Sequence, residues 1–500
     1  MCRSTACPPV IPSLMRKAKI VCTIGPASAE PAILERLIKS GMDVARLNFS
    51  HGTHDSHRAA IASIRAAAER LHLPVAIVQD LQGPRIRVGV LEGDGVEVMA
   101  AQRIRLVGGM LRSGGQIASQ TLALSKVTEI PVTYPQMVRD VRPGARVLID
   151  DGLIELLVTS VSGGAVECQV KTGGRIMSHK GINLPGTTIS APTLTEKDRK
   201  DIRFGVAEGV DYMALSFVSG PEDVQAARRL VAECGGDQPI IAKIERAEAI
   251  TALDLLLEEA DGVMIARGDL GVEMGPEVVP VLQKRIITKA NQHRKLVITA
   301  TQMLESMTQH PSPTRAEASD VANAIFDGTD AVMLSAETAR GQYPVESVQV
   351  MDRIVRVAEG ETAFLNVGPV ERSAGRENRS IPEAMCEAAA SAAAATQAAA
   401  IATFSESGTT ARLLSKQRPA APIVAFTPHD PVRRRMALYW GVLPRLMARV
   451  QDPDDRVRAV EHRLVEETLA GTGDCVVLLS GTVMGQLGGT NAMKLHRILS

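Results

Sequence analysis

Several charged side chains stand where short apolar runs of this chain come to an end. Glu245 closes the segment Lys243-Ile-Glu245, and Asp269 closes Arg267-Gly268-Asp269 after the next apolar run. If these runs are neighbouring parallel strands, the two carboxylates meet at one edge, with Lys243 and Arg267 bringing positive charge. Mg²⁺ takes one or two protein carboxylates and completes its shell with phosphate oxygens and water. The spacing therefore predicts a Mg²⁺ site, although each acid alone is more typical of a surface ion pair.

Cations suited to a phosphate group accompany these acids. In phosphoryl transfer the moving group spreads negative charge over its equatorial oxygens, and nearby cations must stabilise that charge. The candidates are Arg46, Arg87, Lys197 and Lys243. Arg87 equally suits a hinge, and Lys197 equally suits the first turn of a helix capped by Thr195. Together these residue types favour phosphoryl transfer.

Polar residues also follow several other short apolar runs. They are Arg46-Leu-Asn48-Phe-Ser50-His51, Asp80-Leu81-Gln82-Gly83-Pro84-Arg85-Ile-Arg87, Thr301-Gln302 and Ser335-Ala-Glu337-Thr338. The segment 267–271 suits a sharp turn into a short helix whose amide groups face an anion such as a carboxylate. A glycine pair alone is weak evidence for such a site.

Eight short apolar runs must position these residues. They span 19–24, 43–49, 75–79, 211–217, 240–244, 262–266, 296–300 and 331–334, with room for an amphipathic helix after most of them. Strands of this kind with helical crossovers predict an α/β fold, a closed (β/α)₈ TIM barrel whose active face lies at the carboxyl ends of the strands.

The pattern changes between the third and fourth runs. From 88 to 185 the residues alternate apolar and polar with glycine turns such as 113–115, which predicts an inserted all-β lid, a small β-barrel. After about residue 360 a polar stretch, 371–380, precedes a C-terminal α/β unit, in which the alanine-rich piece 384–402 predicts a packing helix. We expect a flexible tail over 1–17, the barrel over 18–87 and 186–360, the lid over 88–185 and the C-terminal domain over 361–500.

Composition narrows the class of protein. Lysine and arginine total 56, as do aspartate and glutamate, so no overall field favours nucleic acid or an acidic membrane surface. The seven cysteines lack the spacing of a metal or redox pair, which favours reduced thiols in the cytoplasm. No run approaches the roughly eighteen apolar residues of a membrane span.

Taken together, the motifs resemble those of pyruvate kinases, from about residue 17 to the end of the chain. The segments that carry the resemblance are 46–52, 80–87, 241–245, 263–271, 300–307, 313–317 and 333–338. The resemblance implies the last step of glycolysis, phosphoryl transfer from phosphoenolpyruvate to ADP giving pyruvate and ATP. It also implies a barrel domain A, a lid domain B, a regulatory domain C and a homotetramer.

The resemblance assigns roles at the phosphoryl end of the site. Glu245 and Asp269 would hold Mg²⁺, or Mn²⁺ in its place. Lys243 would stabilise the transferring group, and Arg46 would bind its phosphate.

The same resemblance places Gly268, Asp269 and Thr301 at the carboxylate end of phosphoenolpyruvate. We expect Thr301 and a nearby water to pass a proton to the enolate, with Ser335 and Glu337 supporting them, because a hydroxyl alone is too weak an acid.

On the nucleotide side the resemblance implicates Asn48, His51, Arg87 and Lys197. Asp151, in a turn of the lid, would approach the nucleotide on closure, which excludes the water that competes for the phosphoryl group.

One motif departs from the pattern of many family members, which need K⁺. Their ion is held by residues matching Asn48, Ser50 and Asp80 and by a threonine, for which this chain has Leu81, and their usual glutamate is replaced by Arg85. We expect activity without K⁺, because Leu81 removes an oxygen ligand and Arg85 supplies a fixed charge. Alternatively, Arg85 points into solvent at the lid hinge.

The C-terminal domain contains a loop between a strand and a helix that suits a phosphate. Its hydroxyl and glycine residues are Ser405, Ser407, Gly408, Thr409 and Thr410. Hydroxyls and free amides at a helix start form a phosphate pocket, so a sugar phosphate or nucleotide could activate the enzyme there. An ordinary helix cap fits equally well, and Glu406 leaves the preferred effector open.

Two other functions remain open at this stage. A metal-dependent barrel lyase or aldolase acting on pyruvate or phosphoenolpyruvate would share the acid pair but needs no nucleotide site. An inactive metabolite sensor would keep the C-terminal domain and lose the chemistry. Formation of pyruvate that depends on ADP, together with ATP, distinguishes a kinase from both.

Overall fold

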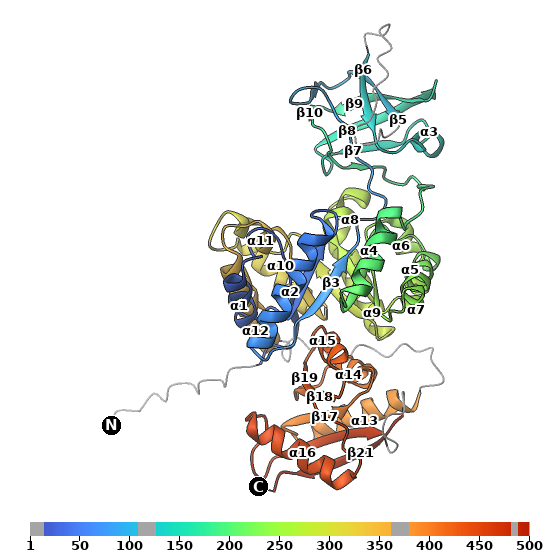
Figure 1. Cartoon of the computed structure of the whole chain (residues 1–500). Helices are drawn as coiled ribbons and strands as arrows, with labels where there is room; N and C mark the ends of the chain where they lie inside the picture. The colour runs from blue at the N-terminus through green and yellow to red at the C-terminus, as the bar shows by residue number, and fades with distance from the viewer. Residues whose placement is uncertain (1–14, 109–126, 362–379, 482–488, 500) are drawn as a thin grey trace, which may run out of the picture.

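The computed structural model describes residues 15–108, 127–361, 380–481 and 489–499. A sheet-rich lid lies at one end of a central barrel and an α/β domain lies at the other end (Figure 1). Residues 1–14 of the expected tail, the 113–115 turn and residues 371–379 of the polar stretch lie outside the described residues.

Eight parallel strands close into a barrel in the order β1-β16-β15-β14-β13-β12-β3-β2. They are β1 (Lys19–Thr23), β2 (Val44–Asn48), β3 (Ala76–Asp80), β12 (Tyr212–Leu215), β13 (Ile240–Ile244), β14 (Gly262–Ala266), β15 (Leu296–Ala300) and β16 (Ala331–Leu334). All except β2 are buried along their whole length, as expected for parallel strands covered on both faces. The predicted barrel is confirmed, and its last four strands have the predicted bounds.

Helices surround the barrel. They are α1 (Pro31–Lys39), α2 (His54–Arg70), α4 (Glu196–Ala207), α5 (Pro221–Glu233), α6 (Ala247–Thr251), α7 (Leu253–Glu259), α8 (Arg267–Met274), α9 (Val279–Gln292), α10 (Arg315–Phe326), α11 (Ala336–Ala339) and α12 (Pro344–Glu361), with the 3₁₀ turn η1 (Glu305–Thr308). Reciprocal caps of Thr195 with Asp198 and of Thr314 with Glu317 fix where α4 and α10 begin. In the described ranges, none of the helices has the length and apolarity needed to cross a membrane.

The lid has its own apolar core and two sheets, ordered β11-β7-β8-β9-β5-β6 and β10-β4. Its elements are β4 (Val96–Val98), β5 (Arg103–Gly108), β6 (Thr128–Val132), α3 (Met137–Asp140), β7 (Arg146–Ile149), β8 (Ile154–Ser162), β9 (Ala165–Thr172), β10 (Gly174–Ile176) and β11 (Ile182–Asn183). Apart from the one-turn helix α3, the described part of this insertion is all β, as predicted.

The C-terminal domain has a five-stranded sheet in the order β19-β18-β17-β20-β21. Its elements are α13 (Ile381–Ala395), β17 (Ala400–Phe404), α14 (Thr409–Ser415), β18 (Ile423–Thr427), α15 (Asp430–Met436), β19 (Val442–Leu446), α16 (Pro453–Glu466), β20 (Cys475–Gly481) and β21 (Thr490–Arg497). The prediction of one packing helix over 384–402 is wrong at its end. Gln397 takes a left-handed conformation (φ 50°) that stops the helix, and the apolar run from Ala400 pairs with β18 and β20 instead.

Aspartates tie the barrel strands together in pairs at the end opposite the lid. The second, fourth, sixth and eighth strands each follow an aspartate whose carboxylate accepts a backbone N–H of the strand before it. The pairs are Asp43 with Ile20 (2.8 Å), Asp211 with Ile77 (2.8 Å), Asp261 with Ile240 (2.9 Å) and Asp330 with Val297 (2.8 Å). Each carboxylate caps an amide that the parallel ladder leaves unpaired.

Two of these aspartates receive cations from the C-terminal domain. Arg434 donates to Asp211 at 2.9 Å, Arg418 donates to Asp330 at 2.8 Å, and Lys416 also pairs with Asp330. Burial lowers the pKa of Lys416 to about 8, although Asp330 opposes this shift. Buried ion pairs therefore hold the C-terminal domain to the end of the barrel that is opposite the lid.

Arg16, which we placed in the flexible tail, is instead fixed at this end of the barrel. Its guanidinium pairs with Asp43 and with Asp352, each at 2.8 Å, and its side chain is only 7 % exposed. The expected boundary of the tail is therefore too late in the chain.

We expect Asp330→Asn to lower the free energy of unfolding by about 3–5 kcal/mol, because it leaves Lys416 buried with an uncompensated charge. Asparagine keeps an oxygen that accepts the Val297 amide. The decrease in the free energy of unfolding therefore measures the effect of removing the negative charge. Asp261→Asn is the matched control and should cost about 1 kcal/mol or less, since its partner Arg228 is exposed. Chemical unfolding of both variants measures the difference, and equal losses would contradict this account.

Candidate active site

A buried ammonium group lies at the centre of the barrel's lid-facing end. Nζ of Lys243, on β13, lies 2.8 Å from a carboxylate oxygen of Glu245 and 3.2 Å from one of Asp80, and it donates to Oγ of Ser216 at 2.7 Å. Burial alone would lower the pKa of Lys243, but Asp80 and Glu245 together raise it. The lysine is therefore held as a cation with its three hydrogens directed at defined partners.

Arg46, on β2, joins the same charge cluster. Its Nε donates to Asp80 at 2.6 Å, and its Nη1 donates to the hydroxyl of Thr23 at 3.0 Å. Burial would raise the pKa of Asp80, but Lys243 and Arg46 lower it. Asp80 thus remains ionised and holds two cations side by side, which is the arrangement that grips a phosphate.

Glu245 and Asp269 lie at the ends of consecutive strands, β13 and β14, as predicted. One Glu245 oxygen contacts Lys243, and the other accepts the backbone N–H of Phe217 at 2.6 Å. Burial raises the pKa of Glu245, against the attraction of Lys243. Asp269 stands in the first turn of α8 with its side chain 27 % exposed.

This acid pair fits a divalent cation. Each carboxylate oxygen keeps a lone pair for a metal, and partial exposure of Asp269 lets a substrate complete the shell. Within the described residues, no group of three or more His, Cys, Asp or Glu side chains forms a metal cage of its own. Two acids plus substrate oxygens and water suit Mg²⁺ better than they suit a structural metal.

Arg267 does not lie where the sequence suggested. Its buried guanidinium turns away from the acid pair, pairs with Asp320 at 2.7 Å and donates to the carbonyl of Thr301 at 2.6 Å. It therefore supports the loop after β15 and brings no charge to the metal site.

Thr301 connects this loop with α8. Its Oγ1 accepts the backbone N–H of Gly268 at 2.9 Å and donates to the carbonyl of Ala300 at 2.7 Å. Thr301 and Gln302 both take left-handed backbone conformations, with φ of 67° and 55°. Such conformations cost about 1–3 kcal/mol each outside glycine and gather at functional sites.

The residues expected on the nucleotide side come from three segments near the lid. Lys197, in the first turn of α4, donates to the carbonyl of Phe49 at 2.6 Å, beside Asn48 and His51. Arg87, in the lid connection, donates to the carbonyl of His179. Partial burial and the charges of Arg87, Arg85 and Arg46 lower the pKa of His51, which keeps its ring neutral near physiological pH.

Ser335 and Glu337 stand behind the site, after β16. Glu337 is fully buried, and its carboxylate accepts the amides of Leu304 (3.0 Å) and Ser335 (2.7 Å). Burial raises the pKa of Glu337. The hydroxyl of Ser335 is buried and makes no hydrogen bond in the structure.

The residues of the monovalent-site motif are also gathered here. Oδ1 of Asn48 accepts the Ser50 amide at 3.1 Å, and Leu81 is buried at 1 % exposure beside Asp80. The guanidinium of Arg85 is one-third exposed and lies 3.8 Å from Asp269.

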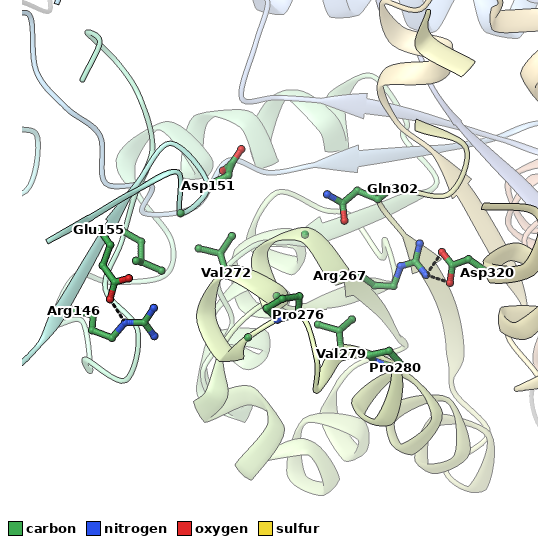
Figure 2. Close-up of a pocket in the computed structure, with 15 residues that line it drawn as sticks. Arg146, Asp151, Glu155, Arg267, Val272, Pro276, Val279, Pro280, Gln302 and Asp320 are labelled. Carbon is green, nitrogen blue, oxygen red and sulfur yellow. Dashed lines mark hydrogen bonds and ion pairs between the residues drawn. The ribbon is translucent and has the colours of Figure 1, made fainter. Parts of the chain in front are cut away.

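A cleft of about 470 Å³ separates the lid from the barrel (Figure 2). Asp151 and the Arg146–Glu155 pair line it on the lid side, and Gln302 lines it on the barrel side (Figure 2). Gly268, which precedes Asp269 in the chain, is part of the barrel wall of this cleft. Glu245 lines a separate, smaller pocket together with Phe217 and Arg246.

Comparison with known proteins assigns this geometry to a family. Residues 15–348 match the family described as pyruvate kinase, barrel domain, and residues 383–496 match pyruvate kinase, alpha/beta domain. The chain is 44 % identical to the pyruvate kinase of Sporosarcina psychrophila, over 97 % of this chain and 81 % of that protein. It is 41 % identical to the pyruvate kinase of Clostridium acetobutylicum, over 96 % and 99 % of the two chains.

The chain belongs to the pyruvate kinases.

A solved structure supports the same assignment for the fold. The crystal structure of a pyruvate kinase from Cryptosporidium parvum has a TM-score of 0.86 and 37 % identity, and the match covers 97 % of this chain and 96 % of that one. The expected TIM barrel, lid and C-terminal domain are thus those of a pyruvate kinase, a phosphotransferase family that depends on Mg²⁺.

The pyruvate kinase site also contains residues that sequence reasoning missed. Ser216 bridges Lys243 and the carbonyl of Leu81, and the strained Phe217 (φ 56°) presents its amide to Glu245. Both stand at the end of β12, one of the two strand ends for which we proposed no site residue. The barrel rule that selected the other ends would have selected this one.

We expect Lys243→Met to lower kcat by about 10³-fold, because the charge that develops on the phosphoryl oxygens loses its buried cation. Lys289→Met removes an ammonium from an exposed ion pair with Asp254 and is the matched control. Steady-state assays with a thermal-unfolding check distinguish lost chemistry from lost structure. A folded Lys243→Met protein with near-normal kcat would exclude this role.

Proposed function

We propose that this site transfers the phosphoryl group of phosphoenolpyruvate to ADP in the cleft beneath the lid. The observation that carries the proposal is the buried cluster of Lys243 and Arg46 around Asp80, beside the acid pair Glu245 and Asp269. Two fixed cations next to two metal-binding acids supply the charge that phosphoryl transfer needs and that an aldol cleavage does not.

In this proposal Glu245 and Asp269 hold Mg²⁺, which would neutralise phosphate oxygens as charge moves from donor to acceptor. Arg46 binds the phosphate of phosphoenolpyruvate, and Lys243 stabilises the group in transit. The P–O bond to the enol oxygen breaks as a β-phosphate oxygen of ADP forms the new bond, which leaves the enolate of pyruvate.

The substrate carboxylate would lie against α8. Gly268 and Asp269 open this helix, and the Thr301 hydroxyl fixes the Gly268 amide at 2.9 Å. Amides at the start of a helix favour an anion. Since the Gly268 amide is bonded to Thr301, the other amides of the first turn, including that of Asp269, would face the carboxylate of phosphoenolpyruvate.

Thr301 is our candidate for passing a proton to C3 of the enolate through a water. Its own hydrogen points to the carbonyl of Ala300, so the hydroxyl must turn toward the site to take part. The unpartnered hydroxyl of Ser335 and the buried Glu337, whose pKa is raised by burial, provide the polar support that such a relay needs.

ADP would bind between the lid and the loop after β2. In this proposal Asn48, His51, Arg87 and Lys197 provide the barrel side of the site. Asp151 lines the cleft between the lid and α8 (Figure 2), and lid closure would carry it toward the nucleotide. Lid closure would then exclude water that otherwise takes the phosphoryl group.

We also propose that the enzyme needs no K⁺. Two observations support this: Leu81 offers a buried apolar side chain where K⁺-requiring members have a threonine, and Asp80 is already paired with Arg46 and Lys243. Arg85 adds a third cation, although its guanidinium lies by Asp269 and not by Asp80.

We expect equal formation of pyruvate and ATP from phosphoenolpyruvate, ADP and Mg²⁺ in K⁺-free buffer and with K⁺ added. Leu81→Thr/Arg85→Glu should lose activity without K⁺ and regain part of it with K⁺, because it restores an oxygen ligand and removes the fixed charge. Arg203→Glu, the same charge change on the exposed face of α4, is the control. Turnover of the unaltered enzyme that depends fully on K⁺ would overturn this proposal.

The same assay decides between the kinase and its alternatives. Pyruvate without ADP dependence would favour the lyase or aldolase, and absence of turnover would favour the sensor. Neither alternative has support from the comparisons, which match pyruvate kinases over nearly the whole chain.

Regulation through the C-terminal domain remains a proposal. In the loop before α14, Ser407 and Thr409 share a hydrogen bond of 2.9 Å, and Glu406 is paired with Arg449 (2.9 Å) and His429 (2.8 Å). Because the guanidinium of Arg449 neutralises Glu406, the hydroxyls of 405–410 stay compatible with a phosphorylated sugar or nucleotide.

We further propose the domain boundaries given above for the residues after 17, a homotetramer and a cytoplasmic location.

A further inference from the structure

The lid joins the barrel through two connections, and the second one passes back and forth between the two bodies. Leu184 belongs to the apolar core of the lid, and Thr187 is buried next to the barrel. Ile189 and Ala191 then pack on the lid core again, and Leu194 enters the barrel core. The connection is therefore a fitted part of both bodies and not a free linker.

A tight turn makes the barrel-side contact. In Leu184-Pro185-Gly186-Thr187 the Thr187 amide donates to the carbonyl of Leu184 at 3.1 Å, and Gly186 has φ of 68°. Proline second and a left-handed glycine third are the signature of a type II turn. The turn's own hydrogen bond uses neither the Gly186 amide nor the Thr187 carbonyl.

Two barrel side chains bind these two groups. A carboxylate oxygen of Glu273 accepts the Gly186 amide at 3.2 Å, and Nη2 of Arg246 donates to the Thr187 carbonyl at 3.0 Å. Arg246 is 8 % exposed, and Glu248 holds its guanidinium at 2.7 Å. The turn is thus fastened by one donor and one acceptor.

Arg246 and Glu273 lie on the same segments as the acid pair Glu245 and Asp269. Arg246 directly follows Glu245, and Glu273 lies one helical turn after Asp269 on α8. Arg246, Glu245, Glu273 and both lid connections enclose a cavity of only about 30 Å³. Little water-sized space therefore remains between the two connections and these barrel side chains.

We propose that Arg246 and Glu273 are positioning residues that fix the lid's pivot to the catalytic end of the barrel. When the 184–187 turn is held, the lid rotates about one point and closes over the site in a single orientation. Without these contacts the lid remains connected to the barrel but closes in several orientations, and water reaches the phosphoryl group. This inference rests on the water-excluding role proposed for the lid.

The test compares Glu273→Ala, Arg246→Ala and the conservative Glu273→Gln, whose side-chain oxygen still accepts the Gly186 amide. Glu277→Ala, in an exposed acid just beyond α8, is the matched control. Hydrogen–deuterium exchange of peptides covering 183–190 is measured in the full-length, ligand-free protein. Pyruvate and ATP are then quantified separately, because attack by water on phosphoenolpyruvate gives pyruvate and inorganic phosphate without ATP.

We expect exchange at 183–190 to rise about 3- to 10-fold in the two pivot alanine variants, in line with the loss of one hydrogen bond. Exchange elsewhere in the barrel should stay unchanged, and the ratio of pyruvate to ATP should rise above one. Glu273→Gln and Glu277→Ala should behave as the unaltered protein does.

Unchanged exchange at 183–190 in both alanine variants would overturn the proposal, as would faster exchange with a pyruvate-to-ATP ratio that stays at one. Exchange that rises throughout the barrel would also overturn it, since that indicates a general structural role. If the unaltered protein makes no ATP, the function proposed for the site fails instead, while the exchange measurement still reports on the pivot.

Discussion

The arrangement of the site depends on the need to pair every charge buried at the lid-facing end of the barrel. An ion pair about 3 Å apart gains about 5 kcal/mol at an effective dielectric constant near 20. Desolvation costs several kcal/mol for each ion, so the net gain is small while the loss of one partner is large. Asp80 must therefore keep Arg46 and Lys243, and Lys243 must keep Glu245. This mutual requirement holds the reactive groups in place before any substrate arrives.

The backbone around the cluster accepts strain to meet that requirement. Phe217 takes a left-handed conformation and donates its amide to Glu245. Thr301 is also left-handed, and its hydroxyl oxygen accepts the amide of Gly268. Gly83 begins the first lid connection with φ of 69°, and a side chain there would approach Phe217 to 2.9 Å. The strained residues support one another, and the closed barrel keeps them from relaxing.

Much of this could be predicted from the sequence because the governing rules are local. Apolar runs of strand length gave the eight barrel strands, and residues at their ends gave Lys243, Glu245 and Asp269. Side-chain direction could not be predicted in the same way. Arg267 and Lys243 both lie near the end of a barrel strand, but the Arg267 side chain pairs with Asp320 on α10 and not with the acid pair. The end of α13 was missed because alanine suits both a helix and a buried strand, and only pairing with β18 and β20 decides between them.

The position of the lid in the chain has a consequence for how the protein folds. The third and fourth barrel strands pair Val78 with Tyr212, so about 130 residues separate these partners. Apart from β1 and β16, which close the barrel, the other paired strands are much closer in sequence. Closing a longer loop costs about 0.6 kcal/mol of entropy for each doubling of length. The lid has its own core, and its two connections meet at the bridge between Arg87 and Gly181. Once folded, it brings the two halves of the barrel within a few residues of each other. The inserted lid therefore also shortens the search by which β12 finds β3.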